Sequence, residues 1–281
     1  MPIKFALIGD GTIAKYHREA IKHVGGELLE QNITDPKYAP TEYTQENPGN
    51  NLFSKIGVYS SLESFLLVER LKDEGLCSWK ETTPKFDYIS ICSPSHLHRQ
   101  QIKDILNVCP NIKIICEKPA FLPWEMPIDS DRINIVLQLR YLPNLPKKAD
   151  LVSVRFVRDE AYFKSWKGDA RNTGGLFCNL FIHYIHLAQI LGADFEGVVS
   201  EHGEQERFIR RWGVGQYDKI DILNIDNQAC YNRMYEDIVE GKGIKPSDLF
   251  YLSWTLARNS EIFGYGKGSL GRTITIKNEL M

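Results

Sequence analysis

An apolar stretch of the chain ends in an acid, an amine and a proline. Ile112–Cys116 is followed directly by Glu117–Lys118–Pro119. The β-branched run is typical of a buried strand, and Pro119 ends it because proline has no N–H for the sheet ladder. Ligands of open α/β sheets bind beyond the carboxyl ends of the strands, where Lys118 could hydrogen-bond a substrate oxygen. Taken alone, a solvated loop lysine is the more common case.

A second chemical motif follows the first strand pattern, Ile3–Ile8. Gly9–Asp10–Gly11–Thr12–Ile13–Ala14 has the spacing G-x-G-x-x-A and opens a helical pattern that runs to about Val24. The first glycine permits a tight turn, and the second lets the backbone approach a pyrophosphate at the helix N-terminus. The motif predicts dinucleotide binding by Gly9, Gly11, Thr12 and Ile13. The alternative is a tight turn without a ligand.

Asp35 is predicted to select the nucleotide. It follows the second strand pattern, Glu27–Ile33, at the distance from the glycine loop where a carboxylate binds the adenosine ribose hydroxyls of NAD. A carboxylate there would repel the additional phosphate of NADP. We therefore expect NAD as the cofactor, although Asp–Pro is also common where a plain loop begins.

Strands and helices alternate through the first half of the chain. Further strands are expected at 56–59, 86–92 and 133–139, and helices at about 62–73 and from the residues after Pro94 to about Val108. The alternation predicts a doubly wound parallel sheet, an α/β Rossmann domain over residues 1–142. Prolines 119, 123 and 127 predict an extended crossover before the strand at 133, with the Lys118–Pro119 bond a candidate for the cis form.

The pattern changes after Pro146. Strands are expected at 151–158, 194–202, 206–213 and 217–225, with helices at 176–191, about 229–240 and about 248–262. Strands grouped in this way predict an α+β domain over residues 143–281, built on a mostly antiparallel sheet. Substrate binding and oligomerisation are assigned to this domain.

Composition argues against several classes of function. The net charge of -2 gives no sign of a nucleic-acid-binding surface. The six cysteines form no CxxC pair, so we expect reduced thiols in a cytoplasmic protein and no zinc or other metal site. The N-terminus leads into a strand without a signal peptide, and the apolar helix at 176–191 is predicted to be too short and too polar to cross a membrane.

The motifs occur in one order along the chain. The glycine loop is followed by Ser93–His98, by Glu117–Lys118–Pro119, and by Gly174–Gly175 with His183 beyond them. This order resembles the family of glucose–fructose oxidoreductase, inositol dehydrogenase and MocA. In that family the amine of the Glu-Lys-Pro motif and a histidine on the first long helix of the second domain flank the substrate. The resemblance implies catalytic roles for Lys118 and His183. It also implies cofactor contacts from Ser93, Pro94, His98, Glu117 and Gln138.

Oxidation of a secondary alcohol requires a group that accepts the hydroxyl proton and a donor that stabilises charge on the oxygen. The ordinary pKa of histidine suits proton removal, so His183 is assigned as the base. Lys118 is assigned to hydrogen-bond the same oxygen. An exchange of these two roles stays open.

A narrower resemblance concerns Leu137–Arg140 and the run Tyr162–Asp169. Both resemble bacterial UDP-N-acetyl-2-amino-2-deoxyglucuronate dehydrogenases, which oxidise a sugar 3-hydroxyl with NAD and supply a PLP aminotransferase in surface-polysaccharide synthesis. A nucleotide-sugar substrate is thereby implied, and cations in the loop would match its diphosphate or carboxylate; solvated loop charge is the alternative. The implied substrate contacts are Arg140, Lys164, Trp166, Lys167, Asp169, Arg171, Asn179 and His186.

Asn179 and His186 depart from the family, because both stand where aspartate is usual. Two other functions stay open. One is a family oxidoreductase acting on a free sugar or polyol, and the other is a non-catalytic NAD- or sugar-binding protein with the same fold. The resemblance also implies a homodimer or homotetramer formed through the exposed face of the second sheet.

Overall fold

The computed structural model describes residues 2–33, 86–109, 111–143, 145–201, 209–210, 220–221, 226–249, 252 and 274–278. Several predictions fall outside these residues. They are Asp35, the strand at 56–59, the helix at about 62–73, and most of the strands at 206–213 and 217–225 and of the helix at about 248–262.

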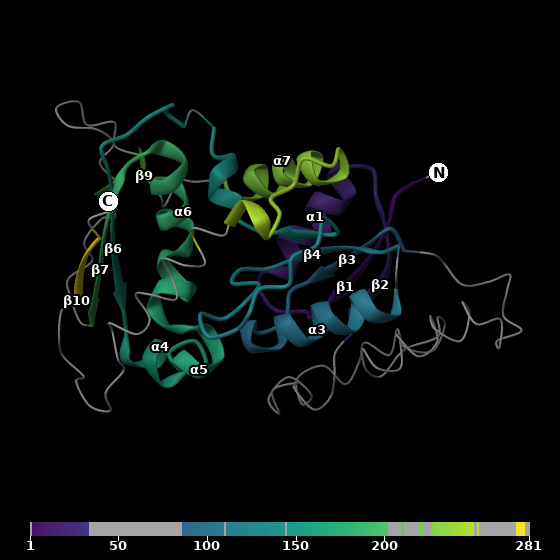
Figure 1. The fold of residues 1–281 in the computed structure, drawn as a ribbon, viewed down its shortest axis with the longest axis horizontal. Coiled ribbons are helices and arrows are strands. Elements are labelled where there is room, and N and C mark those ends of the chain that lie inside the picture. Colours follow the sequence, from purple (N-terminus) through teal and green to yellow (C-terminus); the bar gives the residue numbers. More distant parts are fainter. Residues whose placement is uncertain are drawn as a thin grey trace, which may run out of the picture.

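The first half of the structure is built on a parallel sheet. Its described strands lie in the order β2 (Glu27–Ile33), β1 (Lys4–Ile8), β3 (Tyr88–Ile91), β4 (Lys113–Cys116) and β5 (Ile133–Ile135), and all four pairings are parallel. Helix α1 (Ala14–His23) lies on one face, and α3 (Ser95–Val108) lies on the other (Figure 1). Helices on both faces bury the central strands, as their apolar runs predict. The predicted doubly wound sheet is confirmed.

The connection from β4 to β5 is extended. The described residues 117–132 contain no helix, and the Lys118–Pro119 peptide bond is cis. Near the end of this segment the Arg132 guanidinium donates to the carbonyl oxygens of Cys109 (2.7 Å) and Leu106 (3.2 Å). The predicted extended crossover is therefore confirmed, and Arg132 ties its end to the end of α3.

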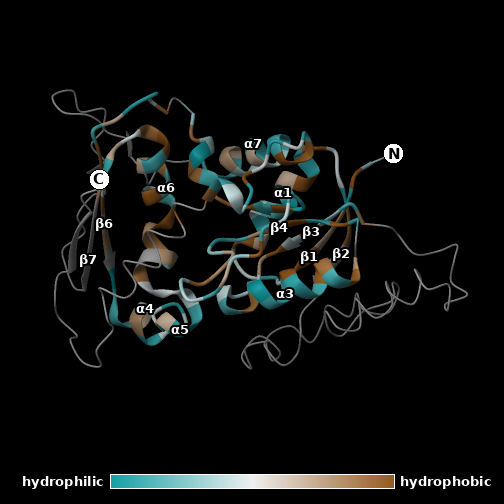
Figure 2. Cartoon of the chain, in the orientation of Figure 1, coloured by the Kyte–Doolittle hydropathy of each residue, from teal (hydrophilic) through white to brown (hydrophobic). Residues whose placement is uncertain are grey.

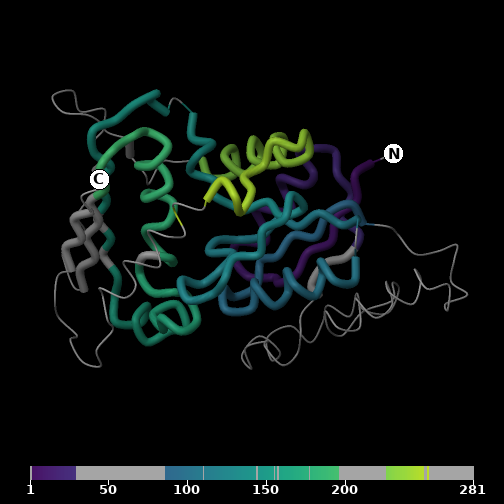
Figure 3. The backbone as a smooth tube through the Cα atoms, in the orientation of Figure 1, coloured from purple at the N-terminus to yellow at the C-terminus, as the bar shows by residue number. Residues whose placement is uncertain are grey.

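Helix α7 (Asn227–Val239) packs on this first half although it comes late in the sequence. It lies beside α1 on the same face of the parallel sheet, as the ribbon and the tube both show (Figures 1 and 3). Tyr231 and Tyr235 are fully buried in a cluster that includes Phe5 and Ile21. The range 143–281, assigned from the sequence to the second domain, thus includes a helix that completes the core of the first half.

The second half contains a mixed sheet. Strand β6 (Leu151–Arg158) runs parallel to β7 (Asp194–Glu201), which runs antiparallel to β10 (Ile274–Asn278). Strands β8 (Ile209–Arg210) and β9 (Ile220–Asp221) form an antiparallel pair. Two of the three described pairs are antiparallel, in line with the prediction. The longest pair is parallel because α6 (Ile182–Leu191) carries the chain back between β6 and β7, as a crossover must.

Helix α6 lies between this sheet and the first half (Figure 1). The helical stretch Ala170–Leu191 spans 22 residues and, contrary to the prediction from the sequence, is long and apolar enough to cross a membrane. However, 82% of its most apolar window is buried inside the protein. Figure 2 shows the hydrophobic character of α6 in brown. This burial indicates that the stretch is a core helix.

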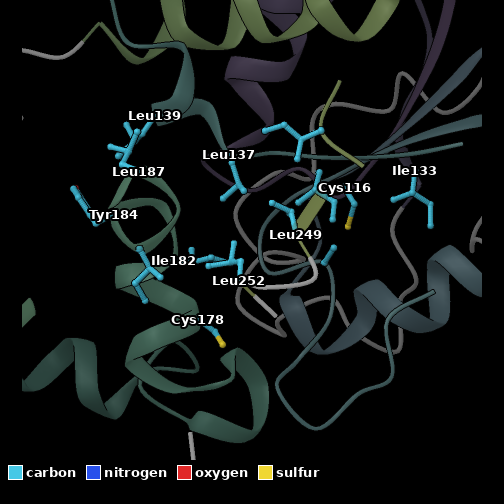
Figure 4. Packing of buried hydrophobic residues seen from close by; sticks show 14 of the residues in the cluster. Cys116, Ile133, Leu137, Leu139, Cys178, Ile182, Tyr184, Leu187, Leu249 and Leu252 are labelled. Atoms are coloured by element: carbon cyan, nitrogen blue, oxygen red, sulfur yellow. The ribbon is translucent and has the colours of Figure 1, made fainter. Parts of the chain in front are cut away.

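One hydrophobic cluster continues from the first half into α6. Figure 4 shows Leu139, which follows β5, beside Leu187 of α6, and places Cys178 and Ile182 on the same side as α6. Within the described residues five cysteines are buried free thiols, and the sixth, Cys77, lies outside them. The shared core fixes α6, and His183 on it, relative to the ends of β4 and β5.

Candidate active site

The loop between β1 and α1 has the geometry of a pyrophosphate site. Gly9 has φ +88°, and a Cβ there would lie 2.9 Å from the carbonyl carbon and oxygen of Cys92. A Cβ on Gly11 would meet no atom of the described residues within 4 Å. In the described residues, Ile13 at the start of α1 makes no side-chain cap, and the first turn holds no acidic residue. Open space over Gly11 and uncapped N–H groups suit a bound phosphate, so Gly9, Gly11, Thr12 and Ile13 fit NAD.

The other predicted cofactor residues follow neighbouring strands of the same sheet. Ser93 and Pro94 come after β3, Glu117 comes after β4, and Gln138 comes after β5 in a short 3-10 helix, Gln138–Tyr141. Because the strands are parallel, these residues lie at the edge that carries the glycine loop. The sheet therefore gathers the predicted cofactor residues at one edge, except Asp35, which lies outside the described residues.

His98 connects two of these loops. One of its ring nitrogens, Nδ1, lies 2.8 Å from the carbonyl oxygen of Pro119, and Nε2 lies 2.7 Å from that of Ser93. Burial lowers the pKa of His98, although the hydrogen bonds to the two carbonyl oxygens oppose this change. The sequence predicted a cofactor contact. In the structure the side chain is 1% exposed and its nitrogens face the protein backbone.

Glu117 is held by three donors. Its Oε1 accepts from the Tyr231 hydroxyl (2.6 Å) and from His17 Nε2 (3.0 Å), and its Oε2 accepts from the Lys118 N–H (3.2 Å). Burial alone would raise the pKa of Glu117, but the hydrogen bonds from His17 and Tyr231 and the charge of Lys118 outweigh burial and lower it. A buried carboxylate thus lies directly before the predicted catalytic amine.

Lys118 joins the two halves of the molecule. Its Nζ donates to the carbonyl oxygen of Asn179 at 2.8 Å. Asn179 lies in a π-helical turn, Phe177–Phe181, which leads directly into α6. Such turns break the regular ladder and occur often at functional sites. Burial lowers the pKa of Lys118 while the charge of Glu117 opposes this, so the amine releases a proton more readily than a surface lysine does.

The Asn179 side chain makes two hydrogen bonds that hold the residue whose carbonyl oxygen binds Lys118. Its Nδ2 donates to the Tyr162 hydroxyl (2.6 Å) and to the backbone carbonyl of Lys167 (3.2 Å). The sequence predicted that Asn179 binds substrate, whereas its amide is used to hold the loop. Lys167 itself is close enough for its charge to contribute to the lowered pKa of Lys118. The Lys167 loop therefore lies near the predicted catalytic amine.

The remaining loop charges are paired within the protein. Lys164 ends helix α4 (Glu160–Lys164) and bonds the Glu160 carboxylate at 2.8 Å. Arg171 bonds Asp169 at 2.7 Å, and Asp169 also caps helix α5 (Ala170–Thr173). Trp166 is 46% exposed, and its ring lies 5.9 Å from the Lys167 amine. Of the predicted substrate residues in this loop, Trp166 and Lys167 are thus the pair best placed for a ligand.

His183 and His186 lie one turn apart on α6. His183 is buried in the first turn of the helix, just after the Asn179 turn that receives Lys118. Burial lowers the pKa of His186 to about 4; the charge of Arg140 acts in the same direction, and that of Asp248 opposes it. His186 is therefore neutral at neutral pH, and its Nε2 has no hydrogen-bond partner among the described residues. Arg140 is exposed in the 3-10 helix after β5.

Comparison with known families agrees with this geometry. Residues 3–130 match the oxidoreductase family with the NAD-binding Rossmann fold that is named after Gfo, Idh and MocA. The match lies within the first half of the chain. The family predicted from the sequence is confirmed, and so is NAD as the cofactor. The protein is an NAD-dependent oxidoreductase. Metal-binding clusters of three or more side chains are absent from the described residues.

Solved structures extend the likeness to the second half. The WlbA (WbpB) dehydrogenase of Thermus thermophilus, in complex with NAD and UDP-GlcNAcA, is 23% identical with a TM-score of 0.64, over 96% of this chain and 97% of that one. The WlbA dehydrogenase of Bordetella pertussis, with NADH and UDP-GlcNAcA, is 17% identical (TM-score 0.55; 94% and 96% covered). A myo-inositol dehydrogenase of Corynebacterium glutamicum is 16% identical (TM-score 0.56; 98% and 99% covered). At these identities the likeness shows the fold.

Proposed function

We propose that this oxidoreductase oxidises the 3-hydroxyl of a UDP-linked N-acetylated sugar or of its uronate. The observation that carries the proposal is the bond from Lys118 Nζ to the Asn179 carbonyl at 2.8 Å. It brings an amine from the NAD-binding edge to the turn that leads into the helix of His183. In this proposal the two groups that the oxidation of an alcohol requires come from different halves of the molecule, Lys118 from the first and His183 from the second.

The chemistry assigned to the chain is the movement of one proton at one oxygen. His183 accepts the proton of the substrate hydroxyl, and Lys118 donates a hydrogen bond to the same oxygen as negative charge develops there. The lowered pKa of Lys118 also suits the exchanged roles, in which the amine accepts the proton. NAD, when bound along the glycine loop, would accept the two electrons of the alcohol as a hydride. The Asn179 carbonyl orients the amine.

The substrate class rests on the loop beside Lys118. Lys167 can bind a phosphate or carboxylate oxygen, and the exposed Trp166 ring can stack on a sugar or base. Two structures of similar fold hold UDP-GlcNAcA. A 3-keto sugar is the kind of carbonyl compound that a PLP-dependent aminotransferase converts to an amine. We therefore propose that a PLP-dependent aminotransferase uses the product. We also propose that the protein acts in the cytoplasm.

Turnover tests this proposal directly. The protein is incubated with NAD and, in separate samples, UDP-N-acetylglucosamine, its uronate, the free N-acetylated sugar and myo-inositol, under anaerobic conditions. We expect NADH absorbance to rise with a UDP-linked substrate and mass spectrometry to find a product lighter by two hydrogens. We also expect NAD to bind more tightly than NADP because of Asp35. Equal or tighter binding of NADP would remove that role from Asp35.

A free sugar or polyol is the second candidate. The ion pairs of Lys164 and Arg171 favour it, because two of the three loop cations are already neutralised by carboxylates of the chain. Turnover of myo-inositol without turnover of any UDP-sugar would establish this second function. NAD binding without turnover of any substrate would favour a binding protein.

Assembly is a separate proposal about the β6–β7–β10 sheet. Helix α6 covers one face of this sheet, and we propose that the other face joins a second copy of the chain. Sedimentation or light scattering at micromolar concentration should then give the mass of a dimer or tetramer. A monomer of 32.3 kDa at that concentration would contradict the assembly.

A further inference from the structure

A chain of buried polar side chains lies behind the Glu117–Lys118 turn. His17 of α1 is fully buried; its Nε2 lies 3.0 Å from Glu117 Oε1, and its Nδ1 lies 2.6 Å from the Tyr235 hydroxyl. The Tyr235 hydroxyl lies 2.9 Å from the Ser90 hydroxyl of β3. Tyr231 reaches Glu117 Oε1 directly, at 2.6 Å. These contacts join α1, α7, β3 and the turn after β4.

The donors in this chain can be arranged in one consistent direction. Glu117 is an acceptor on both oxygens, so His17 Nε2 carries a proton and donates. With a neutral ring, His17 Nδ1 is then an acceptor; the Tyr235 hydroxyl donates to it, and the Ser90 hydroxyl donates to Tyr235. A protonated ring reverses the last two bonds and leaves the bond to Glu117 unchanged. In either case Glu117 Oε1 receives two donors in a buried site, where unmade hydrogen bonds are costly.

The fixed position of Glu117 affects the Lys118 amine. Its second oxygen accepts from the N–H of Lys118, and its charge opposes the effect of burial on the Lys118 amine. Two of the donors that fix Glu117 come from helices far away in the sequence, α1 and α7. Burial also makes their position well defined, since His17 is 0% and Tyr231 1% exposed. The carboxylate therefore has little freedom to turn away from Lys118.

We propose that His17 and Tyr231 are positioning residues for Lys118 and act through the Glu117 carboxylate. This rests on the proposed function only in taking Lys118 as the catalytic amine. Helix α7, which comes from the second half of the sequence, would in this way fix the Glu117–Lys118 turn through Tyr231.

A double-mutant cycle on the reactivity of Lys118 tests the proposal without any substrate. Lys118 is acetylated with limiting acetic anhydride over a range of pH, and its labelling is quantified by mass spectrometry against exposed lysines of the same chain. The four proteins are wild type, Tyr231→Phe, Glu117→Gln and the double variant. Glu117→Gln removes the charge that opposes burial, so labelling of Lys118 near neutral pH should rise about tenfold for each unit by which its pKa falls. Tyr231→Phe should raise it about threefold.

The decisive result is the dependence of one change on the other. If Tyr231 acts through Glu117, the effect of Tyr231→Phe should vanish in the Glu117→Gln background. An equal effect in both backgrounds would overturn the proposal. Tyr88→Phe is the matched control, because Tyr88 is another buried tyrosine whose hydroxyl bonds α7, at the Ile238 carbonyl (3.3 Å), and no atom of Glu117. Labelling of Lys118 in Tyr88→Phe should equal wild type; a change as large as that in Tyr231→Phe would also overturn the proposal.

Kinetics add a second readout once a substrate is known. Tyr231→Phe should lower kcat about tenfold and leave the KM for NAD within about twofold, because it removes one hydrogen bond to a charged group away from the glycine loop. If Tyr231→Phe does not fold, His17→Gln is used in the same cycle. The labelling result stands even if UDP-sugars prove not to be substrates, so the two proposals can fail separately.

Discussion

Replacing Lys118 with alanine should lower turnover about a thousandfold or more and leave NAD affinity nearly unchanged. Removal of one donor from a developing oxyanion costs about 10²–10³ in rate, and loss of a proton-transfer group costs a similar factor. The Lys118 amine donates to the Asn179 carbonyl of the second half at 2.8 Å, whereas the pyrophosphate is predicted to bind at other residues, in the glycine loop. Turnover is measured as NADH formation, and NAD affinity by calorimetry.

Lys113→Ala is the matched control for this experiment. Lys113 is an exposed lysine at the opposite end of the same strand, β4. We expect its removal to leave turnover within about twofold, as for most surface substitutions. If Lys118→Ala were to retain near-normal turnover, Lys118 would be a loop lysine without a catalytic role. Loss of NAD binding in Lys118→Ala would instead place the amine at the cofactor.

Local sequence patterns predicted the parts of the fold that depend on local physics. The glycine loop requires a positive φ at Gly9, and only glycine adopts such a conformation readily, so its position could be read from the sequence. The prolines after Lys118 exclude a helix from the crossover for an equally local reason. The order of these motifs along the chain also indicated the family and its cofactor, and both are confirmed.

The long-range contacts of His17 and Asn179 could not be predicted from local sequence patterns. His17 reads as a histidine on a helix face, and its partners Glu117 and Tyr235 are 100 and 218 residues away in the sequence. The same limit applies to Asn179, whose side chain was predicted to touch substrate. A regular helix was expected at Asn179, whereas the structure has a π-helical turn there, and the carbonyl oxygen of Asn179 accepts a hydrogen bond from Lys118. Burial and long-range packing decide such roles, and neither has a local signature.

Replacement of each loop glycine by alanine should separate folding from cofactor binding. At Gly9, φ +88° is unfavourable for alanine, and its Cβ would lie 2.9 Å from the backbone carbonyl of Cys92. The backbone strain and the overpacking together should cost about 2–4 kcal/mol of unfolding free energy. The displaced backbone would carry Ser93, whose carbonyl faces His98, so we expect NAD affinity to fall as well.

Gly11→Ala should behave differently, because its Cβ meets nothing within 4 Å in the described residues and its φ is ordinary. The unfolding free energy should change by less than about 0.5 kcal/mol. The added methyl group would nevertheless fill the space through which a pyrophosphate approaches the backbone, so NAD affinity should fall about tenfold or more. Urea unfolding and calorimetric titration with NAD give the two quantities for each variant. A Gly11→Ala protein that binds NAD as tightly as wild type would show that the pyrophosphate does not lie over this loop, whatever the effect of Gly9→Ala.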